Sequence, residues 1–145
     1  MTPVFLLVDG NNIIHAWPDL LELHRRQNGL AHAELERRML AYQDLTGRRV
    51  VLVFDGRGTK INEERKPGGM QVIYTSGSKT ADDIIEQLAT KYSGTYEITV
   101  ATNDRMEQDL VIASGGYAVD SFQLRDLLDR AEGEMRRFIQ QRRKR

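Results

Sequence analysis

The sequence predicts an α/β domain in which a central, mainly parallel five-stranded sheet lies between two layers of helices. Five short runs rich in β-branched and aromatic residues alternate with longer segments that have the apolar spacing of helices. The runs are apolar on both faces, which is typical of parallel strands covered on each side. With 145 residues, 40% of them hydrophobic, the chain can build one core, so we expect a single domain over residues 1–145.

The expected strands are short apolar runs. They are VFLLV (4–8), VVLVF (50–54), QVIYT (71–75), EITVA (97–101) and YAV (117–119). Between them, apolar residues recur at helical spacing, and helices are predicted over residues 18–26, 31–45, 81–92, 104–113 and 122–141. Residues 56–69, GRGTKINEERKPGG, have neither pattern and are predicted to form a long mobile loop.

The net charge of zero conceals an asymmetry between the body of the chain and its end. Residues 136–145, RRFIQQRRKR, carry six basic residues and no acid, which leaves 15 basic and 21 acidic residues in the rest. This basic helix end fits an electrostatic contact with a polyanion. It equally fits a solvated helix end, because basic residues suit the C-terminal dipole.

The absence of cysteine excludes a disulfide framework and a thiolate metal site, and it favours the reducing cytoplasm as the location. The early apolar run, Val4 to Val8, is too short to span a membrane and lacks the flanks of a signal peptide. We therefore expect a cytoplasmic protein without a membrane partner.

Acidic residues follow the predicted strands. Asp9 and Asp55 come directly after the first two strands, Asp82 and Asp83 open the helix after the third, and Asp104 follows the fourth. In an open parallel sheet, ligands bind at the carboxyl edge near the topological switch point. The carboxylates are thus expected where a ligand would sit.

Each of these residues also has a purely structural interpretation. Thr80 with Asp83 forms a near capping box, and Asp82 would complement the helix dipole. Asp104 could be an N-cap with Glu107 at the third helical position, and Asp-Gly pairs are common in turns. Taken singly, a cap or a turn is the favoured explanation.

Taken together, the carboxylates indicate a cation site. Two carboxylates about 4 Å apart repel by roughly 4 kcal/mol at an effective dielectric of 20. Oxygen ligands without histidine or cysteine favour Mg²⁺ or Mn²⁺ over zinc. The chemistry that follows is metal-assisted hydrolysis of a phosphodiester, in which the cation acidifies a water and offsets charge on the leaving oxygen.

Four segments carry a resemblance to a known family. They are VDGNNIIHAWPDL (8–20), LVFDG (52–56), VIYTSGSKTADDIIE (72–86) and VATNDRMEQ (100–108). In this order they resemble the bacterial YacP-like branch of the NYN domains, relatives of the PIN-domain ribonucleases. The resemblance implies a PIN-like three-layer α/β/α fold and a metal-dependent endoribonuclease. By position, it makes four residues catalytic metal ligands: Asp9, Asp82, Asp83 and Asp104.

The resemblance also suggests supporting residues. Asn12 matches the asparagine that braces Asp9 or a metal-bound water, and Asp55 and Asn103 are expected in supporting positions. Contacts to RNA phosphates are expected from basic residues beside the site and at the chain end: Lys79, Arg105, Arg142, Arg143, Lys144 and Arg145. From charge alone, ribosomal RNA or translating mRNA is a natural partner.

Other functions remain open from the sequence. A catalytically silent RNA-binding or adaptor module of the same fold is the main alternative, and it predicts incomplete ligands. A DNA flap nuclease would need extra helical elements for which the chain has no room. A phosphatase of the parallel-sheet type would show a second aspartate two residues after the first, where Asn11 stands.

Overall fold

The computed structural model describes residues 3–56, 62–65 and 69–143. The order of helices and strands along the chain is β1 (Val4–Asp9), α1 (Gly10–Ala16), α2 (Pro18–Arg26), α3 (Asn28–Thr46), β2 (Arg49–Phe54), β3 (Asn62–Arg65), β4 (Gln71–Tyr74), α4 (Ala81–Tyr92), β5 (Glu97–Ala101), α5 (Arg105–Ala113), β6 (Tyr117–Val119) and α6 (Ser121–Arg143). The predicted α/β class is confirmed, and each predicted strand and helix is present to within a few residues.

The described strands form one sheet in the order β3-β4-β2-β1-β5-β6. Strands β4, β2, β1, β5 and β6 are parallel, while β3 pairs antiparallel with β4 at the edge. The chain leaves β1 toward β2 on one side and reaches β5 on the other, so the order reverses beside β1. The carboxyl end of β1 therefore lies at the topological switch point.

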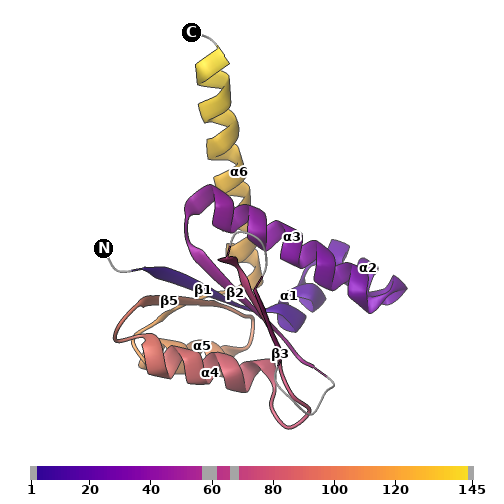
Figure 1. The fold of residues 1–145 in the computed structure, drawn as a ribbon, viewed down its shortest axis with the longest axis vertical. Helices are drawn as coiled ribbons and strands as arrows, with labels where there is room; N and C mark the ends of the chain where they lie inside the picture. The colour runs from indigo at the N-terminus through magenta and orange to yellow at the C-terminus, as the bar shows by residue number, and fades with distance from the viewer. Residues whose placement is uncertain (1–2, 57–61, 66–68, 144–145) are drawn as a thin grey trace.

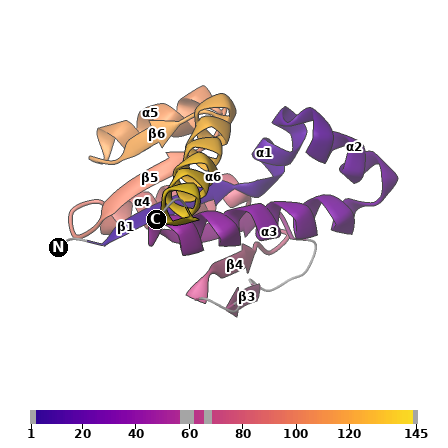
Figure 2. The ribbon, with the colours of Figure 1, turned by 90° about the horizontal axis from the view of Figure 1, so that it is seen from above.

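Helices cover both faces of the sheet, which gives three layers (Figures 1 and 2). Alternate residues of each strand face opposite sides, as a pleated strand requires. On one face, Leu6, Val8 and Leu52 pack with α1, α2, α3 and α6. On the other face, Leu7 and Val51 pack with α4 and α5. The two cores hold the central strands rigidly, and they fix where the strand ends point.

The segment predicted as a mobile loop contains a strand. Asn62–Arg65 pairs antiparallel with β4, so that part of the prediction is wrong; residues 57–61 and 66–68 of the loop lie outside the described part. The sequence of this strand, NEER, has no apolar alternation, because an edge strand can be held by backbone hydrogen bonds alone.

The helix α1 was also missed, because GNN after Asp9 resembles a turn. Gly10 is the first residue of α1, and its φ is not positive. A Cβ atom at Gly10 would lie 2.4 Å from the ring of Phe54 and 3.0 Å from the carbonyl oxygen of Val53. Glycine is needed at this position because β2 approaches closely, not because of an unusual backbone angle.

The last helix, α6, begins against the body and then extends away from it toward the C-terminus (Figure 1). Leu124 and Leu128 are buried in the core near its start, whereas Phe138 and Ile139 are exposed. None of the helices in the described part of the chain has the length and apolar character that a membrane span would need.

Candidate metal centre

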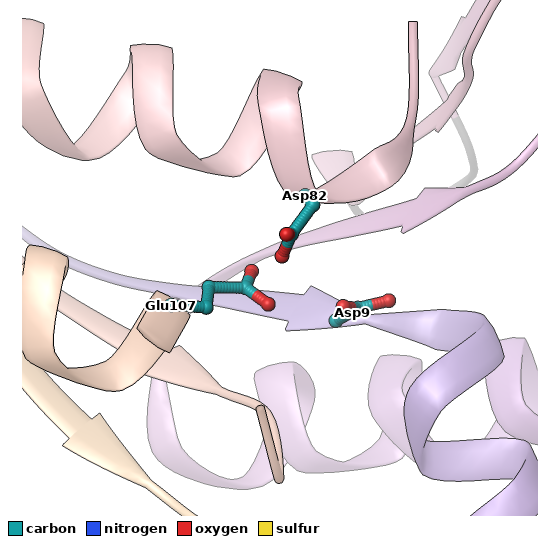
Figure 3. Close-up of side chains that lie close together, drawn as sticks. All are labelled: Asp9, Asp82 and Glu107. Carbon is teal, nitrogen blue, oxygen red and sulfur yellow. The ribbon is translucent and has the colours of Figure 1, made fainter. Parts of the chain in front are cut away.

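Three carboxylates from three different elements meet at the carboxyl edge of the sheet (Figure 3). Asp9 ends β1, Asp82 lies in the first turn of α4, and Glu107 lies in the first turn of α5. One oxygen of each lies within 4.8 Å of one oxygen of each of the others. We call these residues the carboxylate cluster.

The carboxylate cluster is shielded from solvent. Asp9 is 7% exposed and Glu107 is 0% exposed, while Asp82 is half-buried. Burial of several ionised carboxylates is unfavourable unless protons or a cation compensate for the lost hydration. The position of the cluster therefore requires positive charge from outside the set.

Two oxygens of the cluster accept no hydrogen bond from any residue that the structure describes. These are Oδ1 of Asp82 and Oε1 of Glu107, both buried. Buried polar atoms are nearly always satisfied in native proteins, so unsatisfied ones need an explanation. Carboxylate oxygens that lie close together are stabilised by a shared proton, by a water that donates to both, or by a cation, and the exclusively oxygen ligand set fits a divalent ion.

The protonation of Asp9 reflects its surroundings. Burial raises the pKa of Asp9 to about 6, and the negative charges of Asp82 and Asp55 raise it as well. Contacts with Glu107 and with the backbone N–H of Asn12 act in the opposite direction but do not offset burial. In the absence of a cation, Asp9 thus takes up a proton far more readily than an exposed aspartate.

Glu107 is affected more strongly. Burial raises the pKa of Glu107 to about 10, and the adjacent Asp82 carboxylate, which can share the proton, acts in the same direction. The charge of Asp9 adds to this effect, while a hydrogen bond from Thr102 opposes it. At neutral pH without metal, Glu107 is therefore the member of the cluster that holds a proton.

Local structure places Asp9 and Asp82 firmly. Asp9 is the N-cap of α1, and its Oδ1 lies 3.5 Å from the backbone nitrogen of Asn12. Asp82 is fixed by the capping of α4, in which Thr80 and Asp83 exchange hydrogen bonds of 3.1 and 3.2 Å between side chain and backbone. The predicted capping box is thus confirmed, and it determines the direction of Asp82.

Glu107 is placed by the loop between β5 and α5. Asp104 caps α5 by accepting from the backbone N–H groups of Met106 and Glu107 at 3.0 and 3.3 Å. The buried Thr102 hydroxyl donates to Oε2 of Glu107 at 3.0 Å. These contacts engage Oε2 and leave Oε1 of Glu107 without a hydrogen-bond partner among the described residues.

The structure thus brings together two of the four predicted ligands, Asp9 and Asp82. Asp83 and Asp104 lie outside the carboxylate cluster, and their side chains cap α4 and α5. Both still add negative charge to this region. The pKa of Glu86 on α4 is raised, mainly by burial and further by the charges of Asp82, Asp83 and Asp104. The structural interpretation of Asp83 and Asp104 is therefore correct in its geometry.

Sequence reasoning considered Glu107 only as the third residue of a capped helix. A stronger signal was available in its spacing from Val111, which is buried four residues later on the same face of α5. An acidic residue on the inward face of an amphipathic helix must have a partner or a function. This pattern would have identified Glu107 as a candidate ligand.

Two of the expected supporting residues make structural contacts. Asp55 accepts a 2.7 Å hydrogen bond from the backbone N–H of Ala81, the first residue of α4. Its own backbone N–H donates to Oδ1 of Asn11 at 3.0 Å. Asp55 therefore ties the end of β2 to α4 and adds negative charge near Asp9, as expected for a residue outside the ligand set.

Asn12 does not brace Asp9 with its side chain. Its Oδ1 accepts a 2.7 Å hydrogen bond from the backbone N–H of Asn103, and only its backbone N–H is directed at Asp9. The side chain of Asn103 bonds Ser121 twice, donating to Oγ at 2.9 Å and accepting from the backbone N–H at 2.7 Å. These contacts join the starts of α1, α5 and α6 around the site.

The basic residues predicted to contact RNA are exposed where the structure describes them. Lys79 precedes α4, Arg105 begins α5, and Arg142 and Arg143 lie in the last turn of α6. The remaining two, Lys144 and Arg145, lie outside the described residues. Lys79 and Arg105 stand close in sequence to Asp82 and Glu107, whereas the end of α6 extends away from the body (Figure 1).

Comparisons with known proteins agree with this architecture. The YacP-like NYN domain family matches residues 6–145. YacP of Bacillus subtilis is 37% identical over 135 residues, which cover 92% of this chain and 78% of that protein. A crystal structure of Rae1 (YacP) from Bacillus subtilis, in a tryptophan-to-leucine variant, has 33% identity and a TM-score of 0.78, covering 94% of this chain and 81% of that one. A second Rae1 (YacP) crystal structure, also at 33% identity, gives a TM-score of 0.75 with 94% and 80% coverage.

Proposed function

This chain belongs to the YacP-like NYN domain family, and we propose that it is a metal-dependent endoribonuclease that hydrolyses RNA phosphodiester bonds. The NYN domain has a PIN-like nuclease fold, so the family supports hydrolysis of nucleic acid in general. Beyond the nuclease fold, we propose that the site binds a divalent ion, that the carboxylate cluster provides its ligands, and that RNA is the substrate.

The observation that carries the proposal is the carboxylate cluster with its two unsatisfied oxygens. In the proposed site, Asp9, Asp82 and Glu107 hold Mg²⁺ or Mn²⁺, because all three offer hard oxygen ligands and no nitrogen or sulfur ligand adjoins them among the described residues. Such an ion supplies an acidified water and positive charge for the phosphate oxygens. Three protein ligands would leave coordination positions of such an ion for water and substrate oxygens.

The residues of this chain have distinct parts in the proposal. Asp9 and Asp82 bind the ion and set its position relative to the sheet edge. Glu107 would hold the ion in its ionised form, since a bound cation would take the place of the proton that stabilises the buried carboxylate. Asp104 and Thr102 orient Glu107, so they act as positioning residues.

An acidic site repels RNA, and the proposal assigns the attraction to basic residues. Lys79 and Arg105 are exposed and stand close in sequence to Asp82 and Glu107, which supports assigning to them contacts with phosphates near the cleaved bond. The basic end of α6 adds long-range attraction, which would be screened at high salt. We propose ribosome-associated RNA or mRNA as the substrate, because its phosphates would be attracted to the basic end of α6.

The test is cleavage of a structured RNA by the purified protein in Mn²⁺, in Mg²⁺ and in EDTA, with Asp82→Asn as the inactive control. We expect cleavage with either ion and none in EDTA or with Asp82→Asn. Tight RNA binding without cleavage under every condition would instead support the silent adaptor, and activity in EDTA would contradict the metal dependence.

A further inference from the structure

Two exposed apolar side chains belong to the first turns of α5 and α6, the helices that follow β5 and β6 at the carboxyl edge of the sheet, where the carboxylate cluster also lies. Met106 is 81% exposed and Phe122 is 83% exposed. They are the most exposed large hydrophobic residues in the described part of the chain, and the next, Ile112 and Tyr117, reach only 59%. Single exposed apolar residues are common on protein surfaces. Exposure alone therefore does not indicate a role for Met106 and Phe122, and their position relative to the site has to be considered.

Both side chains are adjacent to residues that build the site. Met106 directly precedes Glu107, and its backbone N–H donates to Asp104. Phe122 directly follows Ser121, which Asn103 holds by two hydrogen bonds. Because Asn103 lies in the loop that leads into α5, its hydrogen bonds to Ser121 join the segments that carry Met106 and Phe122.

The backbone beneath Phe122 is held unusually firmly for an exposed position. Ser121 receives a third hydrogen bond at its carbonyl oxygen, from Nε1 of the buried Trp17 at 3.0 Å. Asn103 is in turn fixed by Oδ1 of Asn12 at 2.7 Å. An aromatic ring on a rigid backbone loses little conformational entropy when a partner covers it, which favours binding.

We propose that Phe122, together with Met106, is a stacking platform for an unpaired RNA base next to the phosphate that is cleaved. This inference rests on the proposed function. Nucleic-acid bases stack on exposed aromatic rings in many proteins that bind single strands, whereas a base within a duplex is already stacked on both sides. The flexible thioether of Met106 can adapt to the edge of whichever base is present.

The charge of a neighbouring residue also favours single-stranded RNA as the partner of Phe122. Arg105 is exposed between Asp104 and Met106, where it can contact a phosphate of the strand whose base lies on Phe122. An apolar partner protein would gain nothing from this arginine or from the acidic site beside it. The platform thus predicts a substrate class, which is RNA that is unpaired at the cleavage site.

The experiment measures binding and cleavage separately. Binding is measured in the Asp9→Asn background, which prevents cleavage, with an unstructured oligoribonucleotide carrying 2-aminopurine and with a fully paired duplex of the same sequence. In this background, Phe122→Ala should weaken binding of the unpaired RNA about ten-fold and abolish the quenching of 2-aminopurine. Phe122→Trp should restore both, Phe122→Leu should not restore quenching, and duplex binding should not change.

The matched control is Ile112→Ala, which removes an exposed apolar side chain at the far end of α5. It should leave binding unchanged. Unchanged binding by Phe122→Ala, or equal losses on unpaired RNA and duplex, would overturn the platform. If the otherwise unmodified protein cleaves RNA and Phe122→Ala does not alter binding, the platform fails while the nuclease stands. If nothing is cleaved but binding depends on Phe122, the nuclease fails while the platform stands.

Discussion

The hydroxyl of Thr102 donates a 3.0 Å hydrogen bond to Oε2 of Glu107, and Oε1 of the same carboxylate accepts none from the described residues. One oxygen therefore orients the side chain, the other has no partner among the described residues, and the carboxylate contributes an oxygen to the cluster with Asp9 and Asp82. Metal ligands are typically oriented by hydrogen bonds from residues that do not bind the metal themselves. The contact from Thr102 would fix Glu107 in this way before an ion binds.

Glu107→Gln tests that assignment. We expect Mn²⁺-dependent cleavage to fall by roughly 100-fold or more, because ligands influence the ion at least as strongly as their supporting contacts do. The metal-free protein should keep or gain thermal stability, since glutamine can still accept from Thr102 and carries no charge. Glu132→Gln, an exposed change on α6, is the control for general effects. Full activity in Glu107→Gln would remove Glu107 from the site.

Asp104→Asn distinguishes the ligands inferred from resemblance from those that geometry brings together. Asparagine caps helices about as well as aspartate, so stability should change little, whereas Asp104→Ala should cost about 1 kcal/mol. Because Asp104 positions Glu107 without joining the cluster, Asp104→Asn should reduce cleavage much less than Asp82→Asn. Complete loss of cleavage at unchanged melting temperature would show that Asp104 is itself a ligand.

The metal-free protein should lose stability as the pH rises. Asp9 and Glu107 have ordinary pKa values of 3.8 and 4.5, and burial raises them to about 6 and about 10 in the folded state. Between these values the folded state binds more protons than the unfolded chain, so the free energy of unfolding falls as pH increases. Thermal melts in EDTA should therefore show a lower melting temperature at pH 8 than at pH 6.

A saturating divalent ion should remove that trend, because neither the ion-bound cluster nor the unfolded carboxylates then hold protons between pH 6 and pH 8. Ion binding displaces protons from the cluster, so affinity and the resulting stabilisation both increase with pH. Melts at pH 6 and pH 8 with saturating Mn²⁺ supply the comparison. The same pH dependence with and without Mn²⁺ would mean that the ion does not bind at these carboxylates.

Replacing residues 142–145 by glutamine tests the basic helix end. The change removes four positive charges without shortening the chain. Binding of single-stranded RNA at low salt should weaken, and the slope of log affinity against log salt should decrease in magnitude by up to about 3. Cleavage of saturating RNA should continue at the same rate. An unchanged slope would exclude an electrostatic role for these residues.

The sequence was sufficient to predict the parallel sheet and the edge that carries the site. The runs around Leu7 and Leu52 are apolar on both faces, which is expected only of strands that are buried on both sides of the sheet. It also predicted that Asp9 lies at this edge with Asp82, because the carboxyl ends of parallel strands meet there. It could not predict β3, whose side chains carry no pattern and whose pairing is made by the backbone.

The ligand set was harder to predict because helix caps and metal ligands use the same residue types. Asp82 and Asp83 are adjacent in sequence, but helical geometry turns one toward Asp9 and uses the other in the capping box. Likewise, Asp104 caps the helix that presents Glu107. Only the packing of α4 and α5 against the sheet decides which carboxylate of each group is directed inward.

Anomalous diffraction from a Mn²⁺-soaked crystal tests the central claim most directly. We expect an anomalous peak in contact with carboxylate oxygens of Asp9, Asp82 and Glu107, while Asp83 and Asp104 continue to cap α4 and α5. A peak held by Asp83 or Asp104 without Glu107, or no peak at this edge of the sheet, would contradict it.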